Sequence, residues 1–151
     1  MPPNTIALEA AEAPLILTLD IGSSSTRAAL YDRQARIVTG VTAQEPYEVR
    51  ATVGGAVEDD PDTAIERAAR CIDGVLALAG HAADRIGGVA LDTLVSNILA
   101  VDAQRQPLTP VITYADTRNA LDADALRADL DEAVVHERTG CLLRTSYWPA
   151  R

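Results

Sequence analysis

The sequence predicts a single α/β domain, and three observations support this fold class. Of the 151 residues, 48% are hydrophobic and 23% are charged, which is the usual balance of a globular protein. Several short β-prone runs lie between residues 15 and 42 and are separated by tight turns. A longer apolar pattern with a helical period follows them. A chain of this length is expected to fold around one hydrophobic core.

The first half of the chain contains three predicted strands. Leu15 to Leu19 is a compact apolar run, and Thr26 to Tyr31 and Arg36 to Thr42 are the next two β-prone segments. The links between them are too short for a crossover helix, so the three strands are predicted to form an antiparallel meander. Residues 1–13 precede this meander and end at Pro14, and they are predicted to form a flexible N-terminal tail.

A helix is predicted to start at Asp60-Pro61 and to end at Gly80. The Asp60 side chain can cap the free backbone N–H groups, proline suits the first helical position, and glycine is a common helix terminator. Within it, apolar residues spaced by three or four predict one buried stripe: Ile65, Ala69, Ile72, Leu76 and Ala79. Residues 45–57 contain a proline and two glycines and are predicted to form a loop or a weak strand.

The second half of the chain predicts further strands and one helix. Ile86 to Leu91, Asn97 to Asp102 and Val111 to Tyr114 are strand candidates. A helix is predicted from about Asn119 to Val134, because Leu126, Leu130 and Val134 are spaced by four. Together with the meander, these segments predict a mixed sheet with helices packed against it.

Charge and cysteine content exclude several classes of function. With 13 basic and 22 acidic residues the net charge is −9, which argues against nucleic acid or an anionic membrane surface as a partner. The two cysteines, Cys71 and Cys141, lie far apart and predict neither a disulfide framework nor a zinc site. No secretory signal pattern and no apolar run of about 18 residues is found, so we predict a soluble, cytoplasmic protein.

The segment from Asp20 to Arg27 has the chemistry of a phosphate-binding turn. An apolar strand delivers Asp20 to its end, and Gly22 then allows a close approach of the backbone to a ligand. Successive N–H groups and the hydroxyls of Ser23, Ser24 and Ser25 can donate to phosphate oxygens, while Arg27 can neutralise charge. Asp20 would repel bare phosphate, so the pattern favours a divalent cation between the two, as Mg²⁺ is usually bound.

A simpler interpretation of the same residues is a serine-rich hairpin turn with a solvated aspartate and arginine, since such turns are common. The segment is not a P-loop, because the chain has no GxxxxGK[ST] pattern and no lysine.

Three ordered motifs give the chain a resemblance to the FGGY carbohydrate kinases. Residues 20–32 resemble the opening phosphate loop of that family, residues 101–118 are similar to the stretch that leads into its W-x-D-x-R motif, and residues 137–141 resemble its E-R-T-G segment. The gluconate kinase and xylulokinase-like branch is the most similar. The resemblance implies that residues 14–151 form part of an actin-like, ribonuclease H-like ATPase domain.

The resemblance also implies roles for individual residues. Asp20 would hold Mg²⁺, and the β- and γ-phosphates of ATP would be bound by Gly22, Ser23, Ser24, Ser25 and Arg27. The sugar or polyol substrate would lie near Ser96, Asn97, Tyr114, Asp116 and Arg118. Glu58 is a further candidate near the sugar. An alternative for Asp116 and Arg118 is a pair that fixes the loop before a helix.

The chain departs from the family pattern in two respects. Where many FGGY kinases carry a Met-His pair, it has Val95 and Ser96, which leaves the substrate identity open. Family members are also several-fold longer, and their catalytic base and adenosine-binding residues would lie beyond residue 151. We therefore expect the isolated chain to bind Mg·ATP weakly and to transfer no phosphate. A truncated chain would leave Leu142, Leu143 and Trp148 without packing partners, so copies could associate.

Two other functions fit the same sequence. One is a non-catalytic remnant or interaction module that kept the actin-like fold, which the 94–96 segment favours. The other is a different actin-like ATPase, although such proteins would carry the phosphate loop without the Tyr114–Arg118 and Glu137–Gly140 segments.

Overall fold

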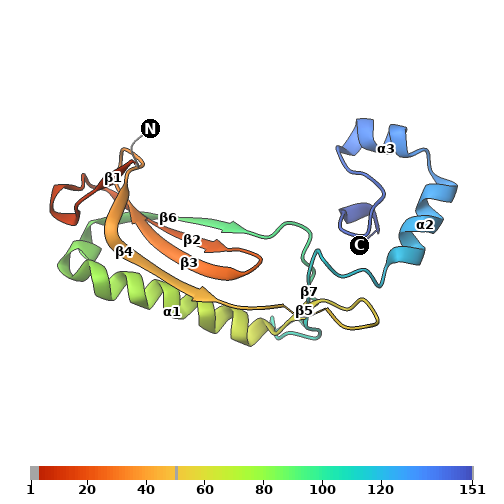
Figure 1. Ribbon diagram of the computed structural model, residues 1–151, viewed down its shortest axis with the longest axis horizontal. Coiled ribbons are helices and arrows are strands. Elements are labelled where there is room, and N and C mark those ends of the chain that lie inside the picture. The colour runs from red at the N-terminus through yellow and green to blue at the C-terminus, as the bar shows by residue number, and fades with distance from the viewer. Residues whose placement is uncertain (1–3, 50, 151) are drawn as a thin grey trace. The chain divides into compact units, whose positions relative to one another are not determined.

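The computed structural model describes residues 4–49 and 51–150. These residues divide into two compact units (Figure 1). The first comprises the chain up to Glu48 together with Asp62–Thr93, and the second comprises Val49–Pro61 and the chain from Leu94 onwards. The principal cluster of buried hydrophobic side chains lies entirely in the first unit.

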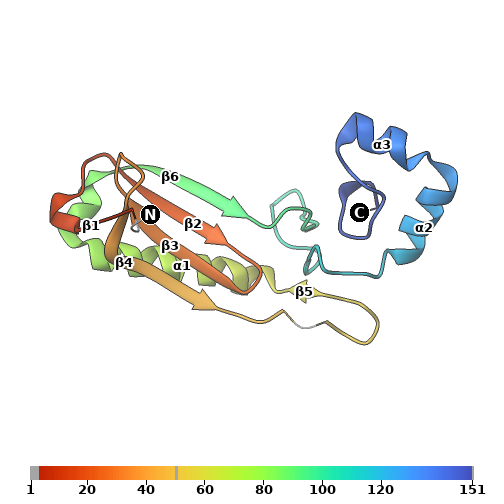
Figure 2. The ribbon, with the colours of Figure 1, turned by 45° about the horizontal axis from the view of Figure 1, so that its top comes forward.

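A five-stranded mixed sheet with the order β1-β4-β3-β2-β6 forms the first unit (Figures 1 and 2). The predicted meander is confirmed, because β2 pairs antiparallel with β3 and β3 with β4. Strand β6 adds to β2 in parallel, so the sheet is mixed as predicted. The bounds are Thr5–Ile6 for β1, Leu15–Ile21 for β2, Ser25–Tyr31 for β3, Ile37–Pro46 for β4 and Ile86–Thr93 for β6.

The segment predicted to be a flexible tail belongs to the sheet. Strand β1 pairs in parallel with β4, a short 3-10 helix follows at Leu8–Ala10, and Ala11 is buried. Ile6 and Leu8 pack against the core, and this apolar contact fixes a segment that shows no strand periodicity. The prediction was therefore wrong for residues 4–13, and residues 1–3 of the predicted tail lie outside the described residues.

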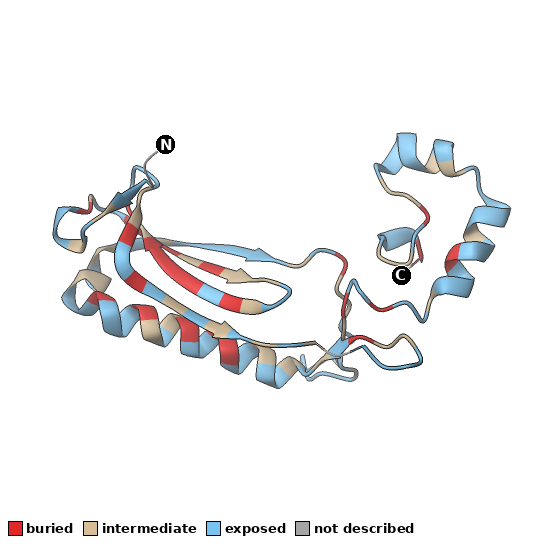
Figure 3. Ribbon diagram, in the orientation of Figure 1, coloured by how far each residue is buried: buried red, intermediate tan, exposed pale blue. Residues whose placement is uncertain are grey.

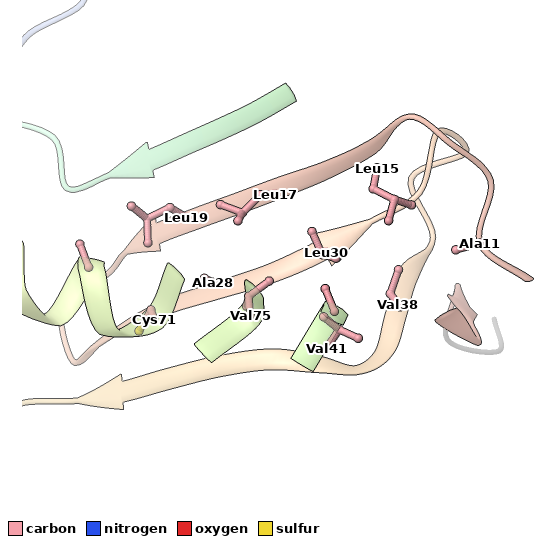
Figure 4. Close-up of a cluster of buried hydrophobic side chains, with 12 residues drawn as sticks. Ala11, Leu15, Leu17, Leu19, Ala28, Leu30, Val38, Val41, Cys71 and Val75 are labelled. Carbon is pink, nitrogen blue, oxygen red and sulfur yellow. The ribbon is translucent and has the colours of Figure 1, made fainter. Parts of the chain in front are cut away.

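Helix α1, Pro61–Ala79, has the predicted bounds, but its buried face differs in part from the predicted stripe. Ile65 is 71% exposed and Leu76 is 38% exposed. Ile72 and Ala79 of the predicted stripe do pack in the core. The rest of the face that packs on the sheet is formed by small side chains (Figures 3 and 4), among them Ala68, Cys71 and Val75. At Gly74 a Cβ atom would lie 2.8 Å from the Cβ of Ala43, so helix and sheet approach too closely there for a larger stripe.

A buried aspartate fixes the turn between β3 and β4. Asp32 accepts hydrogen bonds from the N–H groups of Gln34 and Arg36, and the Arg36 guanidinium lies 2.5 Å from its Oδ2. Glu12 joins the same cluster through its backbone N–H and its carboxylate. Arg36 holds the pKa of Asp32 well below its usual range against the opposing effect of burial. The network therefore attaches the N-terminal segment to the meander.

The second unit is less regular than the sequence predicted. A two-stranded sheet pairs β5, Glu58–Asp59, with β7, Val111–Ile112. The strand predicted at residues 97–102 makes only isolated bridges, Ile98 with Ile112 and Val101 with Pro107. It is therefore irregular rather than a strand, since Pro107 and Pro110 interrupt the segment it would pair with.

The helix predicted at residues 119–134 is two helices, α2 at Ala120–Asp129 and α3 at Glu132–Thr139. Leu130 is extended, and Asp131 accepts hydrogen bonds from the N–H groups of Ala133 and Val134. This aspartate starts a new helix by capping it, a signal that outweighed the four-residue spacing of Leu126, Leu130 and Val134. Gly140 then ends α3 in a left-handed conformation with φ 72°.

One residue of the C-terminal segment, Leu143, is buried contrary to expectation. Leu143 is fully buried, so the expectation that it lacks packing partners was wrong, whereas Trp148 is 52% exposed. Asn119 donates to the carbonyls of Thr145 and Ala150, which holds the final segment, including the 3-10 helix Trp148–Ala150, near the start of α2. Over the described residues, no helix combines the length and the apolar character that a membrane crossing requires.

Candidate functional site

The β2–β3 hairpin holds the two charged residues of the predicted phosphate turn. Asp20 and Arg27 are register partners on these antiparallel strands, so their side chains lie on one face of the sheet. Arg27 Nη2 lies 3.5 Å from Asp20 Oδ2, and both side chains are about half exposed. The ion pair is therefore weak and open to water, and an incoming anion or cation can compete for either partner.

The turn itself, residues 22–24, presents backbone donors to solvent. Its conformation is closed by the Gly22 N–H, which donates to the Ser25 carbonyl over 3.0 Å. A Cβ atom at residue 22 would lie 3.2 Å from that carbonyl oxygen and 3.6 Å from Asp20 Oδ1, so glycine keeps this space open. Ser23 and Ser24 are exposed, and no acceptor among the described residues binds either N–H group. These donors are free to bind an anion.

Two residues that the sequence analysis did not select support the turn. Tyr47 donates its N–H to the Ser24 carbonyl over 2.9 Å and its hydroxyl to the Gly22 carbonyl. Gln44 donates to Ser25 Oγ over 2.9 Å. The residues in these contacts are separated by between 19 and 25 positions in the sequence. The local periodicity of a sequence does not predict contacts between residues so far apart. Only the antiparallel register of β3 and β4, extended beyond Pro46, could have placed Tyr47 opposite Ser24.

The donor set fits a magnesium ion that is shared with phosphate. Asp20 is the register partner of Asp92 on the parallel strand β6, which places a second carboxylate on the same face of the sheet. Over the described residues, no group of three or more His, Cys, Asp or Glu side chains could hold a metal ion by itself. Mg²⁺ usually binds through one or two carboxylates together with water and substrate phosphates, which this arrangement permits.

The second unit contains a cavity of about 420 Å³, a size typical of small-molecule sites. Its wall mixes apolar side chains with carboxylate, guanidinium, amide and hydroxyl groups, contributed by Glu58, Ile98, Thr109, Pro110, Ile112, Asp116, Arg118, Asn119 and Asp122. Two of the five predicted substrate residues, Asp116 and Arg118, line this cavity, and Glu58 joins them.

Asp116 is buried, with 4% of its side chain exposed, and its carboxylate accepts several internal hydrogen bonds. The Val57 N–H donates to Oδ2 over 3.0 Å, the Arg118 N–H donates to Oδ1 over 3.0 Å, and the Arg118 guanidinium binds both oxygens. Burial alone would raise the pKa of Asp116, but these bonds outweigh it and lower the pKa to about 2. Asp116 is therefore an organising residue of the cavity wall.

Arg118 joins two carboxylates of the cavity wall. Its Nη2 lies 2.7 Å from Asp116 Oδ2 and 2.5 Å from Glu58 Oε1, and its side chain is 44% exposed. The bonds to these two carboxylates raise the pKa of Arg118 above its ordinary value. A guanidinium held in this way is a fixed donor for ligand hydroxyl or carboxylate oxygens.

The other three predicted substrate residues do not line the cavity. Asn97 Oδ1 accepts from the Tyr114 N–H over 2.9 Å, so these two residues are paired with each other. Ser96 is buried and has a left-handed backbone with φ 64°, which is uncommon for a residue other than glycine. The predicted substrate set is therefore divided into a group at the cavity and a group around the Asn97–Tyr114 contact.

Comparison with known proteins places these features in one family. The model of the N-terminal domain of the FGGY family of carbohydrate kinases matches residues 15–150. A glycerol kinase of Citrifermentans bemidjiense is 33% identical over 129 residues, which are 85% of this chain and 26% of that protein. A gluconokinase of Bacillus subtilis is 26% identical over 125 residues, covering 83% of this chain and 24% of the relative. The chain thus spans about a quarter of the length of these relatives.

Solved structures of kinases have the same fold as this chain over part of their length. The xylulose kinase from Rhodospirillum rubrum superimposes with a TM-score of 0.80 at 26% identity, over 90% of this chain and 28% of that chain. A glycerol kinase from Plasmodium falciparum with ADP superimposes with a TM-score of 0.73 at 20% identity, over 93% and 28%. The fold is therefore that of the N-terminal part of these kinases, which is actin-like as predicted. The chain belongs to the FGGY family of carbohydrate kinases and contains part of the N-terminal domain.

Proposed function

We propose that this chain supplies the nucleotide-phosphate site of an ATP-dependent carbohydrate kinase. The whole protein would transfer the γ-phosphate of ATP to a hydroxyl group of a sugar, sugar acid or polyol. The observation that carries this proposal is the turn at residues 22–24. It presents the free N–H groups of Ser23 and Ser24 beside the carboxylate of Asp20.

In this proposal each residue of the turn acts on the β- and γ-phosphates. The N–H groups and hydroxyls of the three serines donate to phosphate oxygens, and Gly22 keeps the approach open. Arg27 leaves its weak ion pair with Asp20 to neutralise phosphate charge. Asp20 would hold Mg²⁺, directly or through water, and a bound ion would supply positive charge against the negative charge that develops during phosphoryl transfer. The relatives' family is ATP-dependent, and ADP is named with one solved glycerol kinase.

The cavity of the second unit is the proposed carbohydrate site. Arg118 and Glu58 offer a fixed donor and a fixed acceptor at its wall, and hydroxyl groups can use both. Asp116 positions Arg118, and its own oxygens are occupied by internal bonds. Ser96, Asn97 and Tyr114 remain candidate substrate residues. They do not line the cavity, so in this proposal they would meet only a part of the substrate that extends beyond it. In this proposal the residues of the cavity wall, and not those of the phosphate turn, determine which carbohydrate is bound. They therefore also determine whether the chain is of the gluconate, xylulose or glycerol kinase branch.

We propose that the 151 residues alone bind Mg·ATP without transferring phosphate. Transfer requires a general base and closure around the phosphates, and loss of the base alone typically lowers the rate about 10²- to 10⁴-fold. A second candidate function is a non-catalytic interaction module with the same fold. Val95 and Ser96, which stand in place of the family's Met-His pair, favour this candidate. The two candidates differ in whether the turn binds nucleotide.

Calorimetric titration of the chain with Mg·ATP tests the proposed function. We expect weak, Mg²⁺-dependent binding that Asp20→Asn reduces by about tenfold or more, since the substitution removes a charged ligand of the cation. Asp73→Asn is the matched control, because Asp73 is an exposed aspartate of α1 and the same charge is removed. Equal affinity of the wild-type chain and Asp20→Asn would remove Asp20 from the site. No binding to the wild-type chain would favour the interaction module.

A further inference from the structure

The phosphate turn is held by an aromatic residue that itself packs against a buried cation. Tyr47 follows strand β4 and reaches the turn twice, through its N–H to the Ser24 carbonyl and through its hydroxyl to the Gly22 carbonyl. On the other side, the Arg67 guanidinium of helix α1 lies 4.0 Å from the centroid of the Tyr47 ring. Arg67 is only 6% exposed, so this contact is shielded from water.

The geometry of the peptide bond links these contacts to ligand binding. The Gly22 carbonyl and the Ser23 N–H belong to one trans peptide unit, in which the two groups point in opposite directions. Fixing the Gly22 carbonyl on the Tyr47 hydroxyl therefore turns the Ser23 N–H away from Tyr47. Among the described residues that N–H group has no acceptor, so the direction is set for a ligand and not for a strand partner.

The same contacts also make the Ser23 N–H a stronger donor. A hydrogen bond accepted by a carbonyl polarises its peptide unit and strengthens the donor at the other end. A cation over the face of a tyrosine ring withdraws electron density, which makes the phenol hydroxyl a stronger donor in turn. Polarised contacts thus connect a buried positive charge to an exposed donor. They lead from the Arg67 guanidinium through Tyr47 to the peptide unit of Gly22 and Ser23.

We propose that Tyr47, held by Arg67, is the positioning residue of the phosphate turn and that it sets the direction and donor strength of the Ser23 N–H toward the phosphate of ATP. This inference rests on the proposed function and deepens it. It gives a nucleotide-binding role to two residues outside the Asp20–Arg27 segment. Tyr47 touches no phosphate in this scheme and acts through the Gly22–Ser23 peptide.

Three variants of the chain separate this role from simple stabilisation. Tyr47→Phe removes only the hydroxyl and keeps the ring that Arg67 covers. Arg67→Met removes the charge and keeps an apolar side chain of similar length. Val75→Ala is the control, because Val75 is fully buried between α1 and the sheet and lies outside the contacts of the turn. This control is expected to lower the melting temperature at least as much as Tyr47→Phe does.

The readouts are the amide resonance of Ser23 in the nucleotide-free chain and the dissociation constant of Mg·ATP. We expect Tyr47→Phe to shift the Ser23 resonance and to weaken Mg·ATP binding about fivefold, the equivalent of one hydrogen bond of ordinary strength. Arg67→Met should produce the same two changes with smaller size. Val75→Ala should leave both readouts at the wild-type values.

The outcomes distinguish this inference from the proposed function. If the wild-type chain binds Mg·ATP and Tyr47→Phe binds it equally well, Tyr47 has no positioning role and the proposed function stands. If Val75→Ala weakens binding as much as Tyr47→Phe, the effect is one of general stability and the inference is wrong. If the wild-type chain does not bind Mg·ATP, the proposed function fails and the role of Tyr47 toward phosphate fails with it.

Discussion

The Gly55→Ala variant is expected to be less stable than the wild-type chain by about 2 kcal/mol, because two independent costs combine at this position. Gly55 has a φ of 85°, a conformation that disfavours any side chain. A Cβ atom there would also lie 2.4 Å from Thr117 Oγ1. The Thr117 N–H donates to the Gly55 carbonyl over 3.0 Å, so displacement of residue 55 also disturbs the segment between Asp116 and Arg118.

The neighbouring glycine provides a matched control. Gly54 has no close neighbour for a Cβ atom other than Thr52 Oγ1 at 3.9 Å, and its φ lies outside the left-handed region. Gly54→Ala should therefore change the free energy of unfolding by less than about 1 kcal/mol, in the stabilising direction. Urea denaturation of both variants measures the difference. Equal stability of the two alanine variants would contradict the claim that the positive φ of Gly55 and its closeness to Thr117 exclude a side chain there.

The Asp116→Asn variant is expected to lose about 2 kcal/mol of stability at neutral pH. The substitution keeps the shape of the side chain but replaces one acceptor oxygen by a donor facing the N–H groups of Val57 and Arg118. It also removes the charge that balances the Arg118 guanidinium. Urea denaturation measures the loss, and Asp129→Asn, an exposed aspartate at the end of α2, should change stability by less than about 0.5 kcal/mol.

The same aspartate predicts how this difference depends on pH. In the folded chain the pKa of Asp116 is lowered from 3.8 to about 2, so its carboxylate binds a proton less readily than in the unfolded chain. The stability that Asp116 contributes is therefore complete above about pH 4 and is lost as the pH falls from 4 to 2. The difference in unfolding free energy between wild type and Asp116→Asn should shrink over this range. The contributions of other carboxylates, including Asp32, are the same in both proteins and cancel in that difference. A difference that stays constant between pH 4 and pH 2 would contradict the lowered pKa of Asp116.

The sequence predicted the meander of β2, β3 and β4 well because its signals are local. Short β-prone runs ended by Gly-Ser and Asp-Arg turns define the meander, and each turn is too short for any other connection. The bounds of α1 were predicted for the same reason, since Asp60-Pro61 and Gly80 mark its ends. The buried face of α1 could not be predicted. It depends on how closely the helix approaches β4, which Gly74 and Ala43 determine together.

The candidate site was predicted in part for a related reason. Asp20, Gly22 and Arg27 form a contiguous pattern, and the hairpin brings them together as expected. Tyr47 and Arg67 were not predicted, because their contacts with the turn and with each other come from strand register and helix packing. For Asp116 and Arg118 the interpretation as a loop-fixing pair is confirmed, while their role in binding substrate stays a prediction. The pair fixes a loop, and it does so at the wall of a cavity.

The central claim is that the turn at residues 22–24 receives nucleotide phosphate through an ion held by Asp20. Titration of the isotopically labelled chain with Mg·ATP, followed by the backbone amide resonances, measures this at single residues. We expect the largest shifts at Ser23 and Ser24, smaller ones along residues 20–27, and none of comparable size when Mg²⁺ is omitted. Shifts that are absent from this turn, or confined to another part of the chain, would contradict the claim.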